Sequence, residues 1–341
     1  MKINKEFLYR NLSRIPRFFN QWYLYGFKVA FWCLVFPFKR LFGNLQPYFC
    51  IQKHKSILLY LYKKYSNLID NLSRDNDIPE TLIDPKSPIW VCWWDGEESM
   101  PDLVKICYNT IRKNAENHTV QLITKNNFYD FISIPDYILE KVNSGVMTVT
   151  HFSNIIRVNL LYNYGGIWMD ATILVLQNIF LKNLSFFTLK APAKNSDSVT
   201  LSRYAGLSDL SVSYKYQNIP EISRWSGFLL AGTKNSLIFK YLRDILYAYW
   251  KDHNDQIDYL LFDYTIALGY DNFPVIKKMI DNVPCSPTEK FILEKNMNNE
   301  YSDKEFSQYY STPFHKLTWK LKFDFYTKEN RATIYSHILN F

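Results

Sequence analysis

One run of residues in the middle of the chain limits the fold more than any other feature. From 167 to 176 the sequence reads Ile-Trp-Met-Asp-Ala-Thr-Ile-Leu-Val-Leu, directly after a pair of glycines. A nearly continuous apolar run of this kind predicts a strand that is covered on both faces. Asp170 is its one charged residue. Burial of an unpaired carboxylate is costly, so Asp170 needs a cation or several hydrogen-bond donors nearby.

Helical and extended patterns alternate on both sides of this run. We expect further strands over 89–94, 119–124 and 226–232, and a helix capped by Ser99 that includes Leu103 to Ile111. Other helices are expected over 135–143, 151–164, 236–250 and 258–268. This order predicts an α/β fold with a mostly parallel central sheet flanked by helices. Asp170 would then face the ligand crevice at the carboxyl end of its strand.

The net charge of +8 is confined to the N-terminal region. No Asp or Glu occurs from Phe7 to Ile69, and this stretch carries ten Lys and Arg residues. Residues 70–341 have 28 basic and 31 acidic residues, a net charge of −3. A near-neutral body argues against a nucleic-acid groove, so no nucleic-acid partner is expected. We divide the chain into a helical basic-aromatic arm (1–75), a proline-containing linker (76–88) and one globular domain (89–341).

The arm is also rich in aromatic residues, above all between Trp22 and Phe38. Its longest uncharged stretch, Val29 to Phe38, has ten residues, whereas a membrane-spanning helix needs about 20. Basic and aromatic residues together favour a segment in the headgroup region of an anionic membrane surface. The alternative is a basic helical cap that packs on the domain. The first interpretation predicts a cytoplasmic protein that is peripheral on the inner face of the cell membrane.

Several common sites are excluded by missing motifs. The five cysteines form no C-x-x-C pair, which is typical of a reducing compartment. The chain lacks G-x-G-x-x-G, the P-loop pattern and H-E-x-x-H, so neither a classical dinucleotide site nor a zinc protease site is indicated.

A few residues remain as candidates for chemistry. Asp170 could bind a divalent cation or form a buried ion pair with Arg157 of the preceding helix. Asn154 lies three residues before Arg157, on the same helical face, and Arg157 could grip a phosphate or a sugar hydroxyl.

The other candidates are pairs of neighbours. Gly165 and Gly166 either end a helix or let backbone approach a ligand. Trp93 and Trp94 are core residues or a stacking surface for a base. His315 and Lys316 are a solvated pair or a metal ligand and a diphosphate contact.

Taken together, these segments resemble the capsular polysaccharide synthesis glycosyltransferases, which are related to glycosyltransferase family 32 and its DXD motif. The central motif corresponds to residues 151–172, His-Phe-Ser-Asn-Ile-Ile-Arg-Val-Asn-Leu-Leu-Tyr-Asn-Tyr-Gly-Gly-Ile-Trp-Met-Asp-Ala-Thr. Residues 89–98, 225–231, 259–264 and 314–320 resemble further blocks of the family in the expected order. The resemblance implies a GT-A-like nucleotide-sugar-binding fold. It also implies transfer of a sugar, in hexosyltransferase fashion and with retention, from a nucleotide-sugar donor to a glycan or lipid-linked glycan acceptor in cell-surface polysaccharide synthesis.

The resemblance and the residue patterns above together give the expected site residues. Donor-binding candidates are Trp93, Trp94, Asn154, Arg157, Gly165, Gly166, Asp170 and Lys316, and catalytic candidates are Asp170, Asp263 and His315. Asp95 is a further candidate for acceptor contact or acid–base work.

Two positions depart from the family pattern. Thr172 stands where the second Asp of the DXD motif is expected, and Asn154 stands for a helix Asp. A neutral hydroxyl is a poor ligand for a hard cation. Mn²⁺ or Mg²⁺ could still be held by Asp170 with His315, or Lys316 and Arg157 could neutralise a diphosphate without metal. The missing carboxylate also leaves open a catalytically silent glycan- or lipid-binding subunit of the assembly machinery.

Overall fold

A computed structural model describes residues 14–38, 46–74, 81–181, 184–192 and 222–341 of the 341-residue chain. Parts of the predicted arm and linker (1–13, 39–45 and 75–80) therefore lie outside the described residues. The boundaries between arm, linker and domain stay a prediction.

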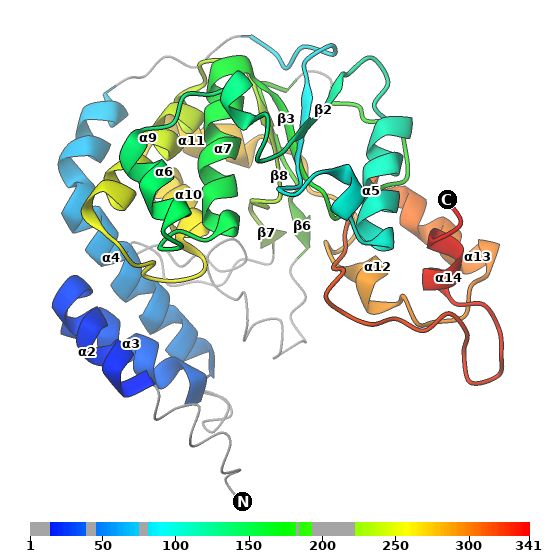
Figure 1. Cartoon of the computed structure of the whole chain (residues 1–341), viewed down its shortest axis with the longest axis horizontal. Coiled ribbons are helices and arrows are strands. Elements are labelled where there is room, and N and C mark those ends of the chain that lie inside the picture. The colour runs from blue at the N-terminus through cyan, green and yellow to red at the C-terminus, as the bar shows by residue number, and fades with distance from the viewer. Residues whose placement is uncertain (1–13, 39–45, 75–80, 182–183, 193–221) are drawn as a thin grey trace, which may run out of the picture.

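The centre of the molecule is a five-stranded sheet with strand order β2-β1-β3-β8-β5 (Figure 1). Its strands are β1 (Ile89–Cys92), β2 (Val120–Ile123), β3 (Gly166–Asp170), β5 (Phe186–Thr188) and β8 (Leu229–Gly232). β1 pairs in parallel with β2 and with β3, while β8 runs antiparallel to β3 and β5. The expected α/β fold with helices on both faces is confirmed. The parallel pair of β1 and β3 ends at Cys92 and Asp170.

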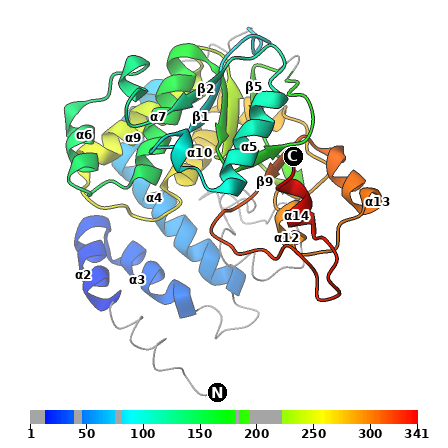
Figure 2. The same ribbon diagram turned by 45° about the vertical axis from the view of Figure 1, so that its right-hand side comes forward.

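Alternate residues of β1 enter separate hydrophobic clusters on the two faces of the sheet. Trp90 packs with the cluster of α7 (Val149–Tyr164), α9 (Leu237–Asp252) and α10 (Leu261–Asn272). Ile89 and Val91 pack with the cluster of α5 (Asp102–Lys113). Figures 1 and 2 show α7, α9 and α10 on one side of the sheet and α5 on the other. Burial on both faces explains why these strands read as apolar runs.

The apolar run around Asp170 is not one strand, which corrects the sequence prediction. β3 ends at Asp170, Ala171 and Thr172 form a turn, and β4 (Ile173–Val175) continues in a second sheet. There β4 pairs with β9 (Phe314–Lys316). Apolar periodicity cannot reveal this break, because the residues on both sides of the turn are buried.

The helix predictions hold, apart from their ends. α6 (Asp136–Asn143), α7, α9 and α10 lie within a few residues of the expected ranges. Ser99 does not cap α5: it lies in a 3-10 turn (Glu97–Ser99), and α5 begins after Pro101. The fixed φ of proline suits the entry to a helix better than the hydroxyl upstream of it. A small C-terminal layer contains α12 (Ile292–Lys295), α13 (Asp303–Phe306) and α14 (Ile334–Ile338). α11 (Pro274–Asp281) packs instead against α10 and β5.

The described part of the arm forms three helices. They are α2 (Arg14–Tyr25), α3 (Phe27–Val35) and α4 (Gln46–Ser73), and α4 packs on α9 and α10. Two short strands, β6 (Ala191–Pro192) and β7 (Ile222–Ser223), pair with each other. Of the helices in the described segments, none combines the length and the apolar character needed to cross a bilayer.

Candidate functional site

Asp170 is the last residue of β3, beside the carboxyl end of the parallel strand β1. Its Cα pairs in register with Cys92, and its backbone N–H donates to the carbonyl of Phe228 at 2.9 Å. Its side chain is 30% exposed, whereas Trp168 two residues earlier is buried. The sheet therefore places this carboxylate, partly exposed, at the carboxyl end of the central strand, where ligands of α/β proteins bind.

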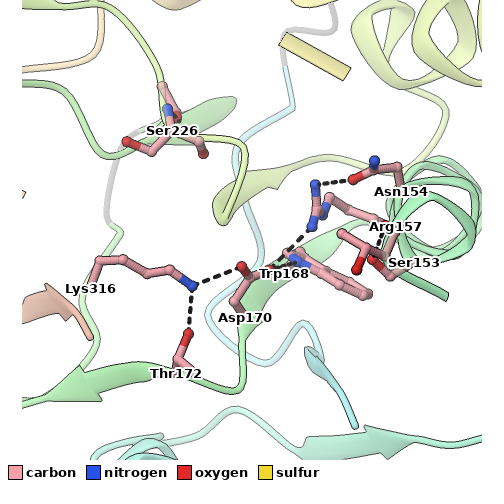
Figure 3. A network of polar contacts seen from close by, with 10 residues as sticks. Ser153, Asn154, Arg157, Trp168, Asp170, Thr172, Ser226 and Lys316 are labelled. Atoms are coloured by element: carbon pink, nitrogen blue, oxygen red, sulfur yellow. Dashed lines mark hydrogen bonds and ion pairs between the residues drawn. The ribbon is translucent and has the colours of Figure 1, made fainter. Parts of the chain in front are cut away.

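Two cations and an indole hold the carboxylate from different sides (Figure 3). Oδ1 accepts hydrogen bonds from Arg157 Nη2 at 3.2 Å and from Trp168 Nε1 at 3.0 Å. Oδ2 accepts from Lys316 Nζ at 3.0 Å. Lys316 also donates to the hydroxyl of Thr172. The network joins α7, β3, the turn after it and β9 around one acidic group.

Arg157 is buried and held in one orientation. Its side chain is 6% exposed, and its guanidinium carbon lies 4.8 Å from the ring centroids of both Trp168 and Phe262. Asn154 accepts a hydrogen bond from Nη1 at 2.9 Å. Asn154 and Arg157 share a helical face as the sequence predicted, and of the two alternatives for Asp170 the structure contains the ion pair with Arg157.

The charges around Asp170 determine its protonation. Burial alone would raise the pKa of Asp170, but the Lys316 ammonium and the Arg157 guanidinium outweigh it and hold the pKa below its usual value. Asp170 is thus ionised at neutral pH. Two cationic side chains thus contact this one carboxylate.

The donor atoms near Asp170 do not fit a divalent cation. Both carboxylate oxygens already accept from cationic side chains, and Thr172 offers a neutral hydroxyl that accepts from Lys316. Hard cations prefer several carboxylate or carbonyl oxygens. Within the described ranges, no three His, Cys, Asp or Glu side chains gather as a metal site would require.

His315 is not brought to Asp170. It follows Phe314 and precedes Lys316 on β9, so its side chain faces away from the side that Lys316 uses. The imidazole is fully buried, and its Nε2 donates to the carbonyls of Tyr309 and Thr312 at 2.8 and 3.2 Å. Burial lowers the pKa of His315, so the ring is neutral. The geometry gives no support to His315 as a metal ligand beside Asp170, and it indicates a packing role.

Gly165 and Gly166 lie at the start of β3, the end opposite Asp170. Both have positive φ angles, 68° and 96°. A Cβ on Gly166 would come within 2.2 Å of the carbonyl oxygen of Pro88. A Cβ on Gly165 would come within 2.7 Å of the backbone nitrogen of Lys234. These glycines end α7 and let backbone segments approach closely. They do not lie beside the other donor-binding candidates.

The two tryptophans after β1 have different surroundings. Trp94 packs against Phe128 and Phe152, with ring centroids 5.6 and 5.5 Å apart, so it belongs to the core. Trp93 is half-buried, and its ring lies 6.1 Å from that of Trp319. Trp319 is 44% exposed. Trp93 and Trp319 therefore form an aromatic edge at the same end of the sheet as Asp170.

The two acid–base candidates, Asp263 and Asp95, have different surroundings. Asp263, in the first turn of α10, accepts a hydrogen bond from Trp225 Nε1 at 3.2 Å. Burial lowers the pKa of Arg157, and the charges of Asp170 and Asp263 partly oppose this. Asp263 therefore lies near the Asp170 network. Asp95 forms an exposed ion pair with Lys125 at 2.9 Å.

Sequence reasoning missed three neighbours of the network. Lys316 Nζ lies 5.2 Å from the ring centroid of Phe228, and Trp319 completes the aromatic edge. Glu294 of α12 is the third: burial raises its pKa, and Lys316 partly offsets this. Trp319 lies in the segment 314–320, which resembles a block of the family, but contacts between segments so distant in the sequence leave no local signal.

Comparisons with known proteins give the family. The search of curated proteins returned no match. One similar solved structure is the PaToxG glycosyltransferase, with 15% sequence identity and a TM-score of 0.36 over 71% of this chain and 90% of that one. The model of the family described as capsular polysaccharide synthesis protein matches residues 39–338. The chain therefore belongs to the capsular polysaccharide synthesis protein family.

Proposed function

We propose that this protein is a glycosyltransferase that moves a sugar from a nucleoside-diphosphate sugar to a glycan acceptor during capsular polysaccharide synthesis. The observation that carries the proposal is the ionised Asp170 at the carboxyl end of β3, held between Arg157 and Lys316. Family membership supports the biological context.

Each side chain of the network has a task in this scheme. Lys316 is 18% exposed at its side chain, so it can reach a diphosphate and stabilise the charge that develops on the leaving group. Asp170 accepts hydrogen bonds from sugar or ribose hydroxyls, and Arg157 keeps it ionised and oriented. The exposed Trp319, with Trp93 behind it, offers an aromatic face to a base.

We propose that the leaving diphosphate is neutralised by side chains. Lys316 lies between Asp170 and Thr172, where the family pattern would have two carboxylates and a cation. Transfer should then persist in a chelator and gain little from added Mn²⁺ or Mg²⁺. A requirement for either ion would refute this part of the scheme.

Of the finer features of the reaction, the configuration rests on the resemblance, and the membrane location of the acceptor rests on the basic-aromatic arm. We propose a hexosyl donor, retention of the anomeric configuration, and a lipid-linked acceptor at the inner face of the membrane. Proton NMR of the product reads the configuration. Comparing a free glycan with the same glycan on a lipid carrier tests the acceptor.

A panel of nucleotide sugars tests the main proposal. Purified protein is incubated with each donor, with chelator or with Mn²⁺, and nucleotide release and glycan products are measured. Lys316→Ala should lower turnover by about a hundredfold, since one lost transition-state donor costs about 3 kcal/mol. The exposed Lys304→Ala serves as matched control and should match the parent.

The competing function is a catalytically silent subunit that binds glycan or lipid. Thr172 in place of a carboxylate favours it. Thermal shift with the same donors distinguishes the two, because a ligand of the native state raises the apparent stability. Absence of both a thermal shift and turnover with every donor would favour the silent subunit. Turnover of one donor would exclude it.

A further inference from the structure

The outer helices of the arm carry a continuous aromatic surface. α2 and α3 pack on each other across Gly26, and their inner sides bury Tyr25, Val29 and Ala30. Their outer side, here called the α2–α3 face, exposes Ile15, Phe19, Trp22, Tyr23, Phe27 and Phe31 by 38–89%. Figures 1 and 2 show this helix pair at the end of the molecule away from the C-terminal layer.

The rings of this face touch one another. The Trp22 ring lies 5.2 Å from Phe27 and 6.4 Å from Phe19, and Phe27 lies 5.9 Å from Phe31. Ile15, Phe19 and Trp22 repeat at helical spacing along α2. Contiguous exposed apolar surface of this kind marks an interaction site, whereas single exposed side chains do not.

The third helix of the arm has a different role. α4 buries Ile57, Leu58, Leu61 and Ile69 against the domain, each at most 1% exposed. Lys53 forms an ion pair with Asp258 at 2.6 Å, and His54 lies 2.6 Å from the Tyr264 hydroxyl. Thus α4 is a basic helical cap that packs on the domain, and it holds α2 and α3 in place.

The charge of the α2–α3 face identifies its occupant. Lys28 is exposed beside Phe27, and neither helix contains Asp or Glu. Arg17 is also exposed but lies on the domain side of α2, near Gln21 and Asp258. A second copy of the same face would bring like charges together. Anionic headgroups instead complement the Lys28 ammonium, while the acyl boundary accepts the rings. Helices of 12 and 9 residues suit a position in the plane of the surface.

We propose that the α2–α3 face is an interfacial anchor that lies in the headgroup region of an anionic bilayer. The family match begins at residue 39 and so does not include these helices. The anchor is also tied to the candidate site: the Tyr25 hydroxyl donates to the carbonyl of Asp255 at 2.9 Å, in the loop before α10, which carries Asp263. If the proposed function holds, the anchor presents this edge of the enzyme to a lipid-linked acceptor.

Vesicle co-sedimentation of the full chain tests the anchor without donor or acceptor. The probes are phosphatidylcholine vesicles and vesicles that also contain phosphatidylglycerol. The parent should bind the anionic vesicles, and salt should weaken that binding. Phe19→Ser/Trp22→Ser/Phe27→Ser should reduce binding about a hundredfold, because each ring loses apolar burial. Lys28→Gln should reduce it about fivefold, roughly 1 kcal/mol for one basic residue.

The control removes equally exposed rings elsewhere. Tyr129→Ser/Phe180→Ser/Tyr326→Ser changes side chains that are 60–62% exposed and should bind vesicles like the parent. Thermal unfolding of every variant checks that lost binding does not reflect lost folding.

Three results would overturn the proposal: a parent that ignores anionic vesicles, a face variant that still binds, or a parent dimer that the face variant dissociates. None of them bears on the donor assay with Lys316→Ala, so failure of the anchor and failure of the proposed function are distinguishable.

Discussion

Replacing Asp170 with asparagine should destabilise the protein as well as abolish transfer. The Arg157 side chain is 6% exposed, and its charge is balanced by the Asp170 carboxylate. Removing one partner of a buried ion pair costs about 3–5 kcal/mol. The asparagine amide would keep an acceptor for Trp168, and the native carboxylate is 30% exposed, so the lower end, about 3 kcal/mol, is expected.

This cost can be expressed as a melting temperature. An unfolding entropy of about 2.1 cal/mol/K per residue over 341 residues gives about 0.7 kcal/mol/K for a cooperative transition, so the variant should melt about 4 °C lower. Calorimetry measures the shift. The matched control is Asp95→Asn, which breaks an exposed pair with Lys125 and should cost less than about 1 kcal/mol.

The pH dependence gives a second check. Although burial raises the pKa of Asp170, Lys316 and Arg157 hold it below the usual value. A lowered folded-state pKa stabilises the protein fully above the unfolded value of about 3.9, and the stabilisation is lost as the pH falls through the folded value. The difference between parent and Asp170→Asn should therefore be constant near neutrality and shrink below pH ~4.

A double-mutant cycle completes the test. Arg157→Met combined with Asp170→Asn should cost less than the sum of the single changes by about 1–3 kcal/mol, because the double variant buries no unpaired charge. An unchanged melting temperature for Asp170→Asn, or additive single changes, would refute the buried pair.

Three further changes test the surrounding structure. Gly166→Ala should cost at least about 3 kcal/mol, since its Cβ would lie 2.2 Å from a carbonyl oxygen at φ 96°; urea unfolding measures it, and a cost under about 1 kcal/mol would contradict the close approach. Lys53→Met should lower stability by about 3 kcal/mol by leaving Asp258 buried and unpaired, and Asp258→Leu in the same chain should restore part of the loss; failure to restore would mean that the pair is not coupled. His315→Asn should lower the melting temperature yet leave turnover per folded molecule unchanged, because the ring hydrogen-bonds only to carbonyls of the C-terminal layer among the described residues; loss of turnover in the folded variant would restore a catalytic role.

Local patterns were sufficient for the five helices α5, α6, α7, α9 and α10 and for half of the site. Asn154 and Arg157 share a helical face by spacing alone, and a lone carboxylate in an apolar strand requires a cation. The sequence therefore predicted the α/β order, and it gave the Arg157–Asp170 pair that the structure contains as one of two alternatives beside a divalent cation.

Long-range pairing decided the rest. The apolar run breaks after Asp170 because β4 joins β9, in a register that sets Ile173 opposite Lys316. Successive side chains of a strand point to opposite faces, so the register that brings Lys316 to Asp170 turns His315 into the core. Residues 146 positions apart in the chain meet only through this pairing. His315 and Lys316 are adjacent in the sequence and look equally suited to the site, and only the folded sheet determines that Lys316 reaches it.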